Sequence, residues 1–144
     1  MSSVDLKGMA SELAEAQKFL AQWWADKGLG ESERFPFELA LEELFVNVAS
    51  YGSGELGTPC NVKLTLRQGA GRIEEGNDAV TLTIQDNGPP FNPVNNETPD
   101  LSASISERDV GGMGIHLTRS VMDSIDYQYE DGFNKTSVSK KINI

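Results

Sequence analysis

The sequence predicts an α+β domain, a two-layer sandwich in which helices cover one face of a mixed, mostly antiparallel sheet. Apolar residues recur at helical spacing in the first fifty residues, and they alternate with polar residues in several later segments. Turn-forming residues join those alternating segments, as expected for hairpins and antiparallel pairing. The 144 residues suit one domain, residues 1–144, with a single core.

Two helices are expected near the N-terminus. Glycines follow residues 9–27, and the second helix is expected to begin near Pro36, since proline suits the first helical position, and to end near Ser50. The first helix carries an apolar stripe that we expect to pack in the core, formed by Met9, Leu13, Ala16, Leu20, Trp23 and Trp24. A partner-docking patch is the alternative for the tryptophan pair.

Four strands are expected after these helices. The segments with alternating polarity are residues 61–67, 80–84, 125–129 and 136–142. A turn at residues 131–134 joins the last two strands, and a long connection at residues 68–78 joins the first two. Residues 92–110 lack periodicity and are followed by a helix over residues 115–124. Loops of that length in small domains are commonly lids or binding loops.

Composition excludes several function classes. The net charge of −10 argues against nucleic acid or an anionic membrane as a direct partner, because both attract a stripe of Lys and Arg. The sequence has neither a long apolar run nor a signal-peptide pattern, so a cytoplasmic location is expected. Cys60 is the single cysteine and is expected to be a structural thiol.

The second helix presents a carboxylate and an amide on one face. Glu43 and Asn47 are four residues apart, so their side chains project together. The carboxylate can accept a proton, and the amide oxygen is a suitable ligand for Mg²⁺. Glu42 lies about 100° around the helix and is assigned to solvent or a supporting role. A solvated helix face is the alternative for Glu43 and Asn47.

Asp86 ends an expected strand, and Asn87-Gly88 signals a tight turn. A carboxylate beside a glycine can accept a hydrogen bond from a ligand amine while the backbone approaches closely. A plain turn without a ligand is the alternative.

A glycine-rich run opens the helix after the long loop: Gly111, Gly112, Met113 and Gly114. Backbone N–H groups at such a site can bind phosphate oxygens, although the run is neither a Walker A loop nor a dinucleotide fingerprint. The loop carries one cation, Arg108, which is a candidate for contacting a triphosphate; an ion pair with Glu107 or Asp109 is the alternative. His116 is expected to be a boundary side chain rather than a phosphoryl acceptor.

These segments, in this order, resemble the motifs of the GHKL ATPase/kinase superfamily (gyrase, Hsp90, histidine kinase, MutL). Residues 41–47 resemble its asparagine box, residues 86–91 its first glycine box and residues 111–115 its second. The size and the N-terminal helix are similar to those of anti-sigma-factor serine-protein kinases of the RsbW and SpoIIAB type. The resemblance implies the Bergerat ATP-binding fold, ATP and Mg²⁺ as cofactors, and a lid over about residues 92–112.

The resemblance also implies a role for each matching residue. Glu43 matches the general base that accepts the proton of a substrate hydroxyl, and Asn47 matches the Mg²⁺ ligand. Asp86, with Gly88 beside it, matches the carboxylate that reads the exocyclic amine of adenine.

Four further residues follow from the same resemblance. Gly112 and Gly114 match the glycines of the phosphate-binding lid hinge, and Met113 between them is a further cofactor-binding candidate. Thr136 matches a threonine near the adenine. Lys135 stands where the family often has glycine, which is a departure from its pattern.

The function implied is an ATP-dependent serine/threonine-protein kinase that acts as an anti-sigma factor. It would phosphorylate a STAS-type anti-anti-sigma protein, bind a sigma factor and form a homodimer. One alternative is a nucleotide-binding regulatory module without kinase activity, and another is an ATP-binding fragment of a larger two-component-like regulator. A self-contained histidine kinase is not expected, because no helix with a phosphoacceptor histidine precedes the motifs.

Overall fold

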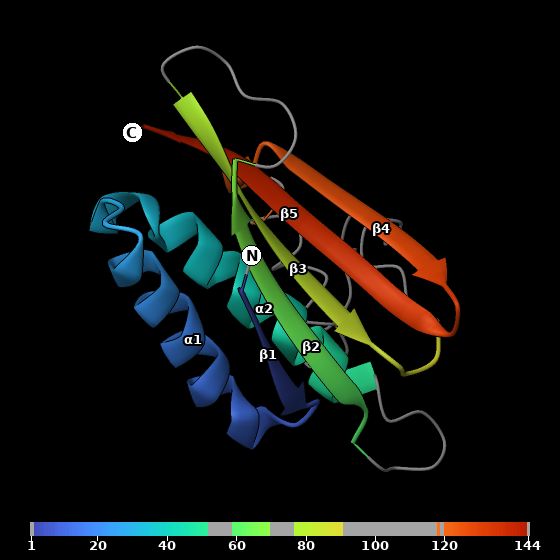
Figure 1. The fold of residues 1–144 in the computed structure, drawn as a ribbon. Helices are drawn as coiled ribbons and strands as arrows, with labels where there is room; N and C mark the ends of the chain where they lie inside the picture. The colour runs from blue at the N-terminus through green and yellow to red at the C-terminus, as the bar shows by residue number, and fades with distance from the viewer. Residues whose placement is uncertain (1, 52–58, 70–76, 91–117, 119, 144) are drawn as a thin grey trace, which may run out of the picture.

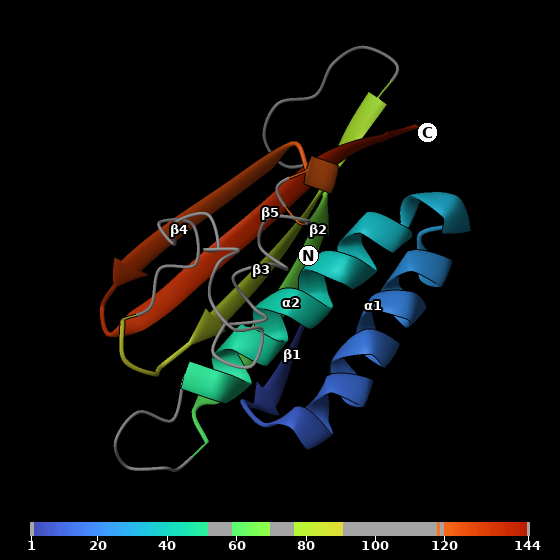
Figure 2. The same cartoon turned by 180° about the vertical axis from the view of Figure 1, so that it is seen from behind.

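The computed structural model describes residues 2–51, 59–69, 77–90, 118 and 120–143. A five-stranded sheet forms one layer, and two helices cover one of its faces (Figure 1; Figure 2 shows the helices in front). Its elements are β1 (Ser2–Lys7), α1 (Leu13–Asp26), α2 (Phe35–Tyr51), β2 (Asn61–Gln68), β3 (Asn77–Asp86), β4 (Ser124–Glu130) and β5 (Phe133–Asn143).

The strand order is β1-β2-β3-β5-β4. Each described pairing in this sheet is antiparallel, so the parallel part of the predicted mixed sheet is not found among the described residues. The predicted α+β class with helices on one face is confirmed.

Helix α1 carries the predicted apolar stripe. Ala16, Leu20, Trp23 and Trp24 are buried, and Leu13 is half-buried against the same core. The prediction was wrong for Met9, which is exposed. The α-helix begins only at Leu13, after a short 3₁₀ turn at Ala10–Glu12. Met9 therefore has an extended backbone and does not lie on the helical stripe.

The tryptophan pair belongs to the core, as predicted. The Trp24 ring lies 5.3 Å from the ring of Phe37 in α2, at an interplanar angle of 47°. The Trp24 Nε1 atom donates a hydrogen bond to the Gly30 carbonyl at 2.8 Å, in the connection between the helices. These contacts fix α1 against α2.

Strand β1 was not predicted. Val4 and Leu6 alternate with polar residues over a segment too short to stand out, and both are half-buried against the core. Val4 pairs with Leu64 and Leu6 with Val62, so β1 extends the sheet beyond β2.

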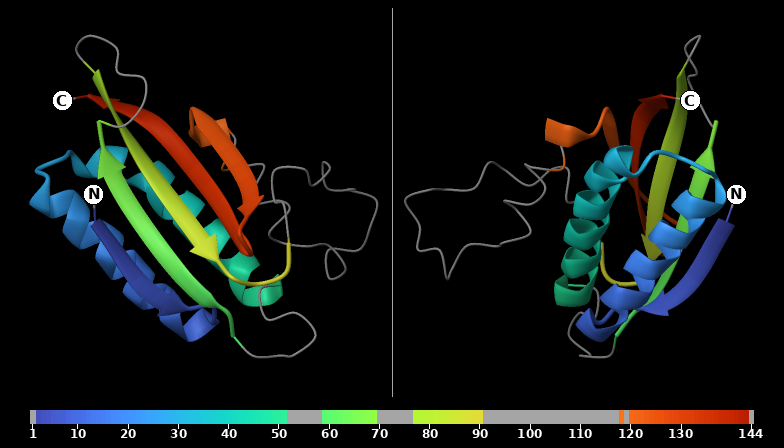
Figure 3. Two further views of the ribbon diagram at one scale, coloured as in Figure 1. Left: turned by 45° about the vertical axis from the view of Figure 1, so that its right-hand side comes forward. Right: turned by 90° about the vertical axis from the view of Figure 1, so that its left-hand side faces the viewer.

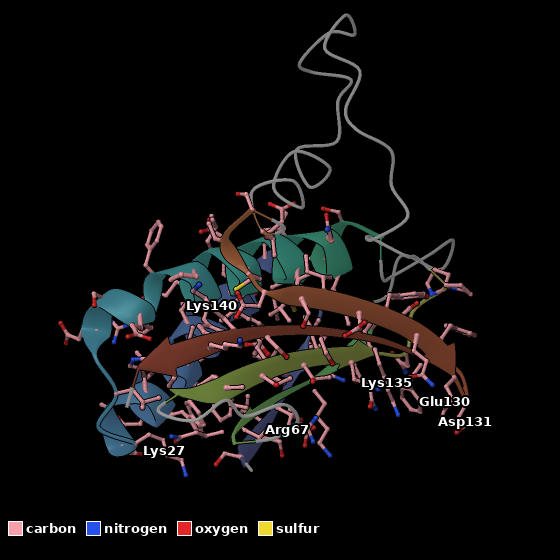
Figure 4. The ribbon with its side chains drawn as sticks, turned by 90° about the horizontal axis from the view of Figure 1, so that it is seen from above. Lys27, Arg67, Glu130, Asp131, Lys135 and Lys140 are labelled. Atoms are coloured by element: carbon pink, nitrogen blue, oxygen red, sulfur yellow. The ribbon has the colours of Figure 1, made fainter. Side chains whose placement is uncertain are left out.

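The two faces of the sheet differ in polarity. The face under the helices is mostly apolar, and its buried residues include Leu64, Leu82 and Val138. On the other face, hydroxyl pairs join β3 to β5: Thr81 with Ser139 at 2.9 Å and Thr83 with Ser137 at 2.8 Å. Arg67 and Lys135 lie on this outer face, away from α2 (Figure 4).

The turn between β4 and β5 is shorter than predicted. Asp131 and Gly132 form it, with φ of 55° and 85°, which matches a two-residue hairpin turn. Phe133 and Asn134, which were predicted to lie in this turn, belong to β5. Asn134 pairs with Asp86 of β3 in the register, and this correction matters for the site.

Other predictions fall on residues that the structure does not describe. Most of the connection at residues 68–78 and all of the lid at residues 92–112 lie outside the described residues. Within the helix predicted for residues 115–124, Thr118, Ser120 and Val121 are helical. No helix in the described part of the chain is long and apolar enough to cross a membrane.

Two phenylalanines at the start of α2 provide a test of the core. Phe37 is fully buried, whereas Phe35 is 62% exposed. We expect Phe37→Ala to lower the free energy of unfolding by about 3–5 kcal/mol, because it leaves a cavity beside Trp24. Phe35→Ala should change it by less than about 0.5 kcal/mol. Urea denaturation measures both, and equal losses would contradict this packing.

Candidate nucleotide-binding site

Helix α2 turns the predicted carboxylate and amide inward. Asn47 is only 4% exposed, and Glu43 is half-buried with its Oε1 atom shielded from solvent. Glu42 is exposed, as predicted. The alternative of a solvated helix face is therefore wrong for Glu43 and Asn47.

The apolar residues of α2 explain how a polar pair can be held inside. Leu41, Leu44, Phe45 and Val48 are buried on adjoining parts of the helix surface and supply its core contacts. The resulting hydrophobic burial anchors α2, so Asn47 is carried inward with its neighbours.

Asn47 retains unused hydrogen-bonding capacity. Its buried Nδ2 atom has no hydrogen-bond partner among the described residues. Leaving such a donor unsatisfied costs about 1–3 kcal/mol, so the buried amide nitrogen calls for an acceptor, such as a ligand oxygen, as its partner.

The donor set fits Mg²⁺ held together with phosphates. No cluster of three or more His, Cys, Asp or Glu side chains is found in the described part of the chain. Mg²⁺ seldom requires one, since it commonly takes one or two protein oxygens plus substrate phosphates and waters. The side-chain oxygen of Asn47 is of the type that could serve as such a ligand.

Asp86 lies buried at the end of β3. Its Oδ1 atom accepts hydrogen bonds from the Gly88 backbone N–H at 2.9 Å and from the Asn134 side-chain amide at 3.0 Å. Burial raises the pKa of Asp86, while these two hydrogen bonds act in the opposite direction. The carboxylate is therefore held in place by donors within a desolvated setting.

The turn after Asp86 is anchored to β2. The Asn61 backbone N–H donates to Oδ1 of Asn87 at 2.8 Å, and the Asn87 N–H donates to the Asn61 carbonyl at 3.3 Å. The chain bends at Gly88 and Pro89, where the sequence predicts a tight turn. Its reciprocal hydrogen bonds fix the backbone beside Gly88.

The asparagine box and the first glycine box lie at the same end of the molecule. A Cβ atom added to Gly8 would lie 2.6 Å from the Cys60 Sγ atom and 3.1 Å from Val48 Cγ1, so α2 packs closely here. Cys60 precedes β2, in which Val62 pairs with Asp86. Figure 3 shows the C-terminal end of α2 beside the end of β3.

Thr136 lies on the same sheet face as Asp86. It pairs with Ile84 in the register, and side chains two residues apart along a strand share a face. Thr136 is buried, which places its hydroxyl in the layer between the sheet and the helices.

Several predicted site residues are not among the described residues. Arg108, Gly112, Met113 and Gly114 lie outside them, as does His116. The phosphate-binding roles of Arg108, Gly112 and Gly114, the cofactor-binding role of Met113 and the boundary position of His116 stay predictions.

Three buried or half-buried polar residues were not singled out as site candidates from the sequence. Thr118 is fully buried, and its hydroxyl has no hydrogen-bond partner among the described residues. Asn134 and Tyr127 form a hydrogen-bonded pair beside Asp86. The one available signal was that Asn134 stands two residues before Thr136 and would share its face in a strand.

Cys60 is buried, as a structural thiol should be. Burial, aided by the negative charge of Asp86, raises its pKa to about 11. The thiol therefore stays protonated at neutral pH and is a poor nucleophile.

Comparison with known proteins identifies the family. The family model described as a histidine kinase-like ATPase domain matches residues 8–140. The chain belongs to this family. The resemblance read from the three motifs is thus confirmed, and membership in this ATPase family implies the use of ATP.

Two known proteins extend the comparison. The serine/threonine-protein kinase BtrW of Bordetella bronchiseptica is 34% identical over 106 residues, which cover 74% of this chain and 69% of BtrW. The crystal structure of the RsbU and RsbW domains of Rv1364c from Mycobacterium tuberculosis has a TM-score of 0.61 and 12% identity. That likeness covers all of this chain but only 33% of the solved chain, and it concerns the fold.

Asp86 should make stability depend on pH. Because its pKa is raised in the folded protein, the folded state holds this proton over a pH range in which the unfolded chain has lost it. Stability should therefore fall as pH rises from the ordinary aspartate range through the raised pKa. Asp86→Asn should lack this decline, which denaturation at a series of pH values measures.

The exposed carboxylate of Asp126 on β4 supplies the control. Asp126→Asn should keep the pH dependence of the unmodified protein. Parallel pH curves for Asp86→Asn and the unmodified protein would contradict the desolvated setting of Asp86.

Proposed function

We propose that this protein is an ATP-dependent serine/threonine-protein kinase that acts as an anti-sigma factor. The observation that carries the proposal is that Glu43 and the buried Asn47 both face inward from one side of α2. The same chain is 34% identical to a serine/threonine-protein kinase. A carboxylate and a metal-ligating amide on one helix face supply two of the groups that phosphoryl transfer to a hydroxyl uses, the general base and a Mg²⁺ ligand.

In this proposal, Glu43 acts as the general base. It accepts the proton of the substrate hydroxyl while that oxygen forms a bond to the γ-phosphorus and the bond from this phosphorus to the bridging oxygen of ADP breaks. Asn47 would hold Mg²⁺, which neutralises phosphate charge when bound. Catalysis then rests on positioning and electrostatics rather than on a covalent enzyme intermediate.

The remaining site residues would bind the nucleotide. Asp86 would accept a hydrogen bond from the exocyclic amine of adenine, with Gly88 leaving room for the base and Thr136 beside it. The phosphates would be bound through the second glycine box and its neighbour in the lid, by Arg108, Gly112, Met113 and Gly114.

The proposed partners are a STAS-type anti-anti-sigma protein as the substrate and a sigma factor as the bound target. Homodimerisation is part of the same proposal. Support comes from the kinase BtrW and from the fold shared with a solved RsbW domain. A sigma-factor partner would place the protein in the cytoplasm.

Transfer from γ-labelled ATP to STAS proteins of the same genome tests the kinase directly. Glu43→Gln should lower transfer by at least about a hundredfold, because general-base catalysis contributes about 10²–10⁴-fold. ATP should still bind to this variant. Glu42→Gln, on the exposed side of α2, should retain transfer. ATP binding without transfer to any STAS protein would favour a regulatory module instead.

Asn47 should govern the dependence of binding on Mg²⁺. Asn47→Ala removes the proposed ligand, so we expect ATP affinity with Mg²⁺ to fall by about tenfold or more. Adenosine affinity should change far less, because adenosine carries no phosphate to share the ion. Calorimetric titration of both ligands makes the comparison, and an equal loss for both would contradict the metal-ligand role.

A further inference from the structure

Asn134 connects the last strand of the chain to the first glycine box. Its side chain is 3% exposed, and Nδ2 lies 3.0 Å from Asp86 Oδ1, 2.9 Å from the Pro89 carbonyl oxygen and 3.3 Å from the Gly88 carbonyl oxygen. One buried amide therefore reaches the carboxylate and two backbone carbonyls of the turn that follows it.

The chemistry of these partners fixes the orientation of the amide. Carbonyl oxygens and an ionised carboxylate only accept hydrogen bonds, so the NH₂ group must face them. The amide oxygen of Asn134 accepts a hydrogen bond from the Tyr127 hydroxyl on β4. A flipped amide would set its oxygen against three acceptors, which makes the observed orientation the favourable one.

The two carboxylate oxygens of Asp86 have different hydrogen-bond partners. Oδ1 accepts from both Asn134 and the Gly88 N–H, whereas no hydrogen bond from the described residues reaches Oδ2. Donors on Oδ1 favour the ionised form against the desolvation that the carboxylate suffers on burial. The second oxygen keeps its capacity to accept from a ligand.

We propose that Asn134 is the positioning residue for adenine recognition: it holds Asp86 ionised and oriented with Oδ2 available to the exocyclic amine, and Tyr127 holds Asn134 in turn. The inference rests on the proposed function, in that Asp86 reads adenine. Asn134 acts through Asp86 and through the turn rather than by contacting the base.

Base discrimination separates this role from a merely structural one. ADP carries the exocyclic amine, and purine riboside 5′-diphosphate lacks it. We expect Asn134→Ala to weaken ADP binding by about ten- to a hundredfold and purine riboside diphosphate binding much less, so that their affinity ratio collapses. An equal loss for both ligands, or an unchanged ratio, would overturn the proposal. Calorimetry measures each affinity, and thermal unfolding verifies that the variant is folded.

The near-isosteric variant Asn134→Asp gives a second test, through pH. Two neighbouring carboxylates cannot both ionise easily, and the protonated partner can donate to Asp86 Oδ1 as the amide does. ADP affinity of this variant should rise as pH falls through the raised pKa of the pair. The unmodified protein should show the opposite trend, because protonated Asp86 accepts the adenine amine poorly. The same pH profile for both proteins would refute the role of Asn134.

Tyrosines on β4 supply a matched pair of variants. Tyr127→Phe removes the hydroxyl that donates to Asn134, and it should lower the ADP to purine riboside diphosphate affinity ratio in the same direction as Asn134→Ala, by a smaller factor. Tyr129→Phe makes the same chemical change on a side chain that is 46% exposed, and it should leave the ratio unchanged. An unchanged ratio in Tyr127→Phe would remove Tyr127 from the proposal.

The outcomes distinguish this inference from the proposed function. An unmodified protein that binds neither nucleotide would refute both proposals. One that binds both equally would refute adenine recognition by Asp86 and the positioning role of Asn134, while phosphoryl transfer still tests the kinase. Discrimination in the unmodified protein that survives in Asn134→Ala would refute the positioning role alone. If Asn134→Ala loses the discrimination but Glu43→Gln does not lower transfer, the positioning role of Asn134 is supported and the general-base role of Glu43 is refuted.

Discussion

The antiparallel pairing of β3 with β5 is the constraint on which the rest of the candidate site depends. It runs without a break from the pair Asn77 and Asn143 to the pair Asp86 and Asn134. Because side chains alternate between the faces of a strand, this register puts Asp86, Asn134 and Thr136 together under the helices. A slip of β5 by one residue would turn Asn134 and Thr136 to the outer face, away from Asp86. The hydroxyl pairs between the same strands on that outer face support the register.

The helix layer supplies the other half of the site by a different force. Burial of the apolar face of α2 against the sheet drives the docking of this helix. Trp24 of α1 packs on Phe37 and so holds the first turn of α2 in place. Asn47 is then carried into the interior, where its amide nitrogen has no hydrogen-bond partner among the described residues. The fold thus leaves a buried hydrogen-bond donor unsatisfied at a position where a ligand could accept from it, as is common at functional sites.

Sequence patterns predicted the elements better than their ends. The alternation in β2 and β3 and the stripe in α1 are strong signals, because each reflects one buried face. Strand β1 escaped notice, since two apolar side chains make a weak pattern. The turn at residues 131–134 was predicted two residues too long, because asparagine after Asp-Gly also favours turns. Because of that error, Asn134 was not identified as a residue of the site. Its buried hydrogen bonds to Asp86, Gly88 and Pro89 depend on its position in β5.

By itself, the sequence determined the family, the α+β class and the pairing of Glu43 with Asn47 on one helix face, because periodicity and ordered motifs are local properties of the chain. Only the tertiary structure decided which side chains are buried together at Asp86. Tyr127 and Asn134 lie about forty residues or more from Asp86 in the sequence, and no local pattern connects them. Their hydrogen bonds exist because the register of three strands, fixed by burial of a shared face, brings them side by side.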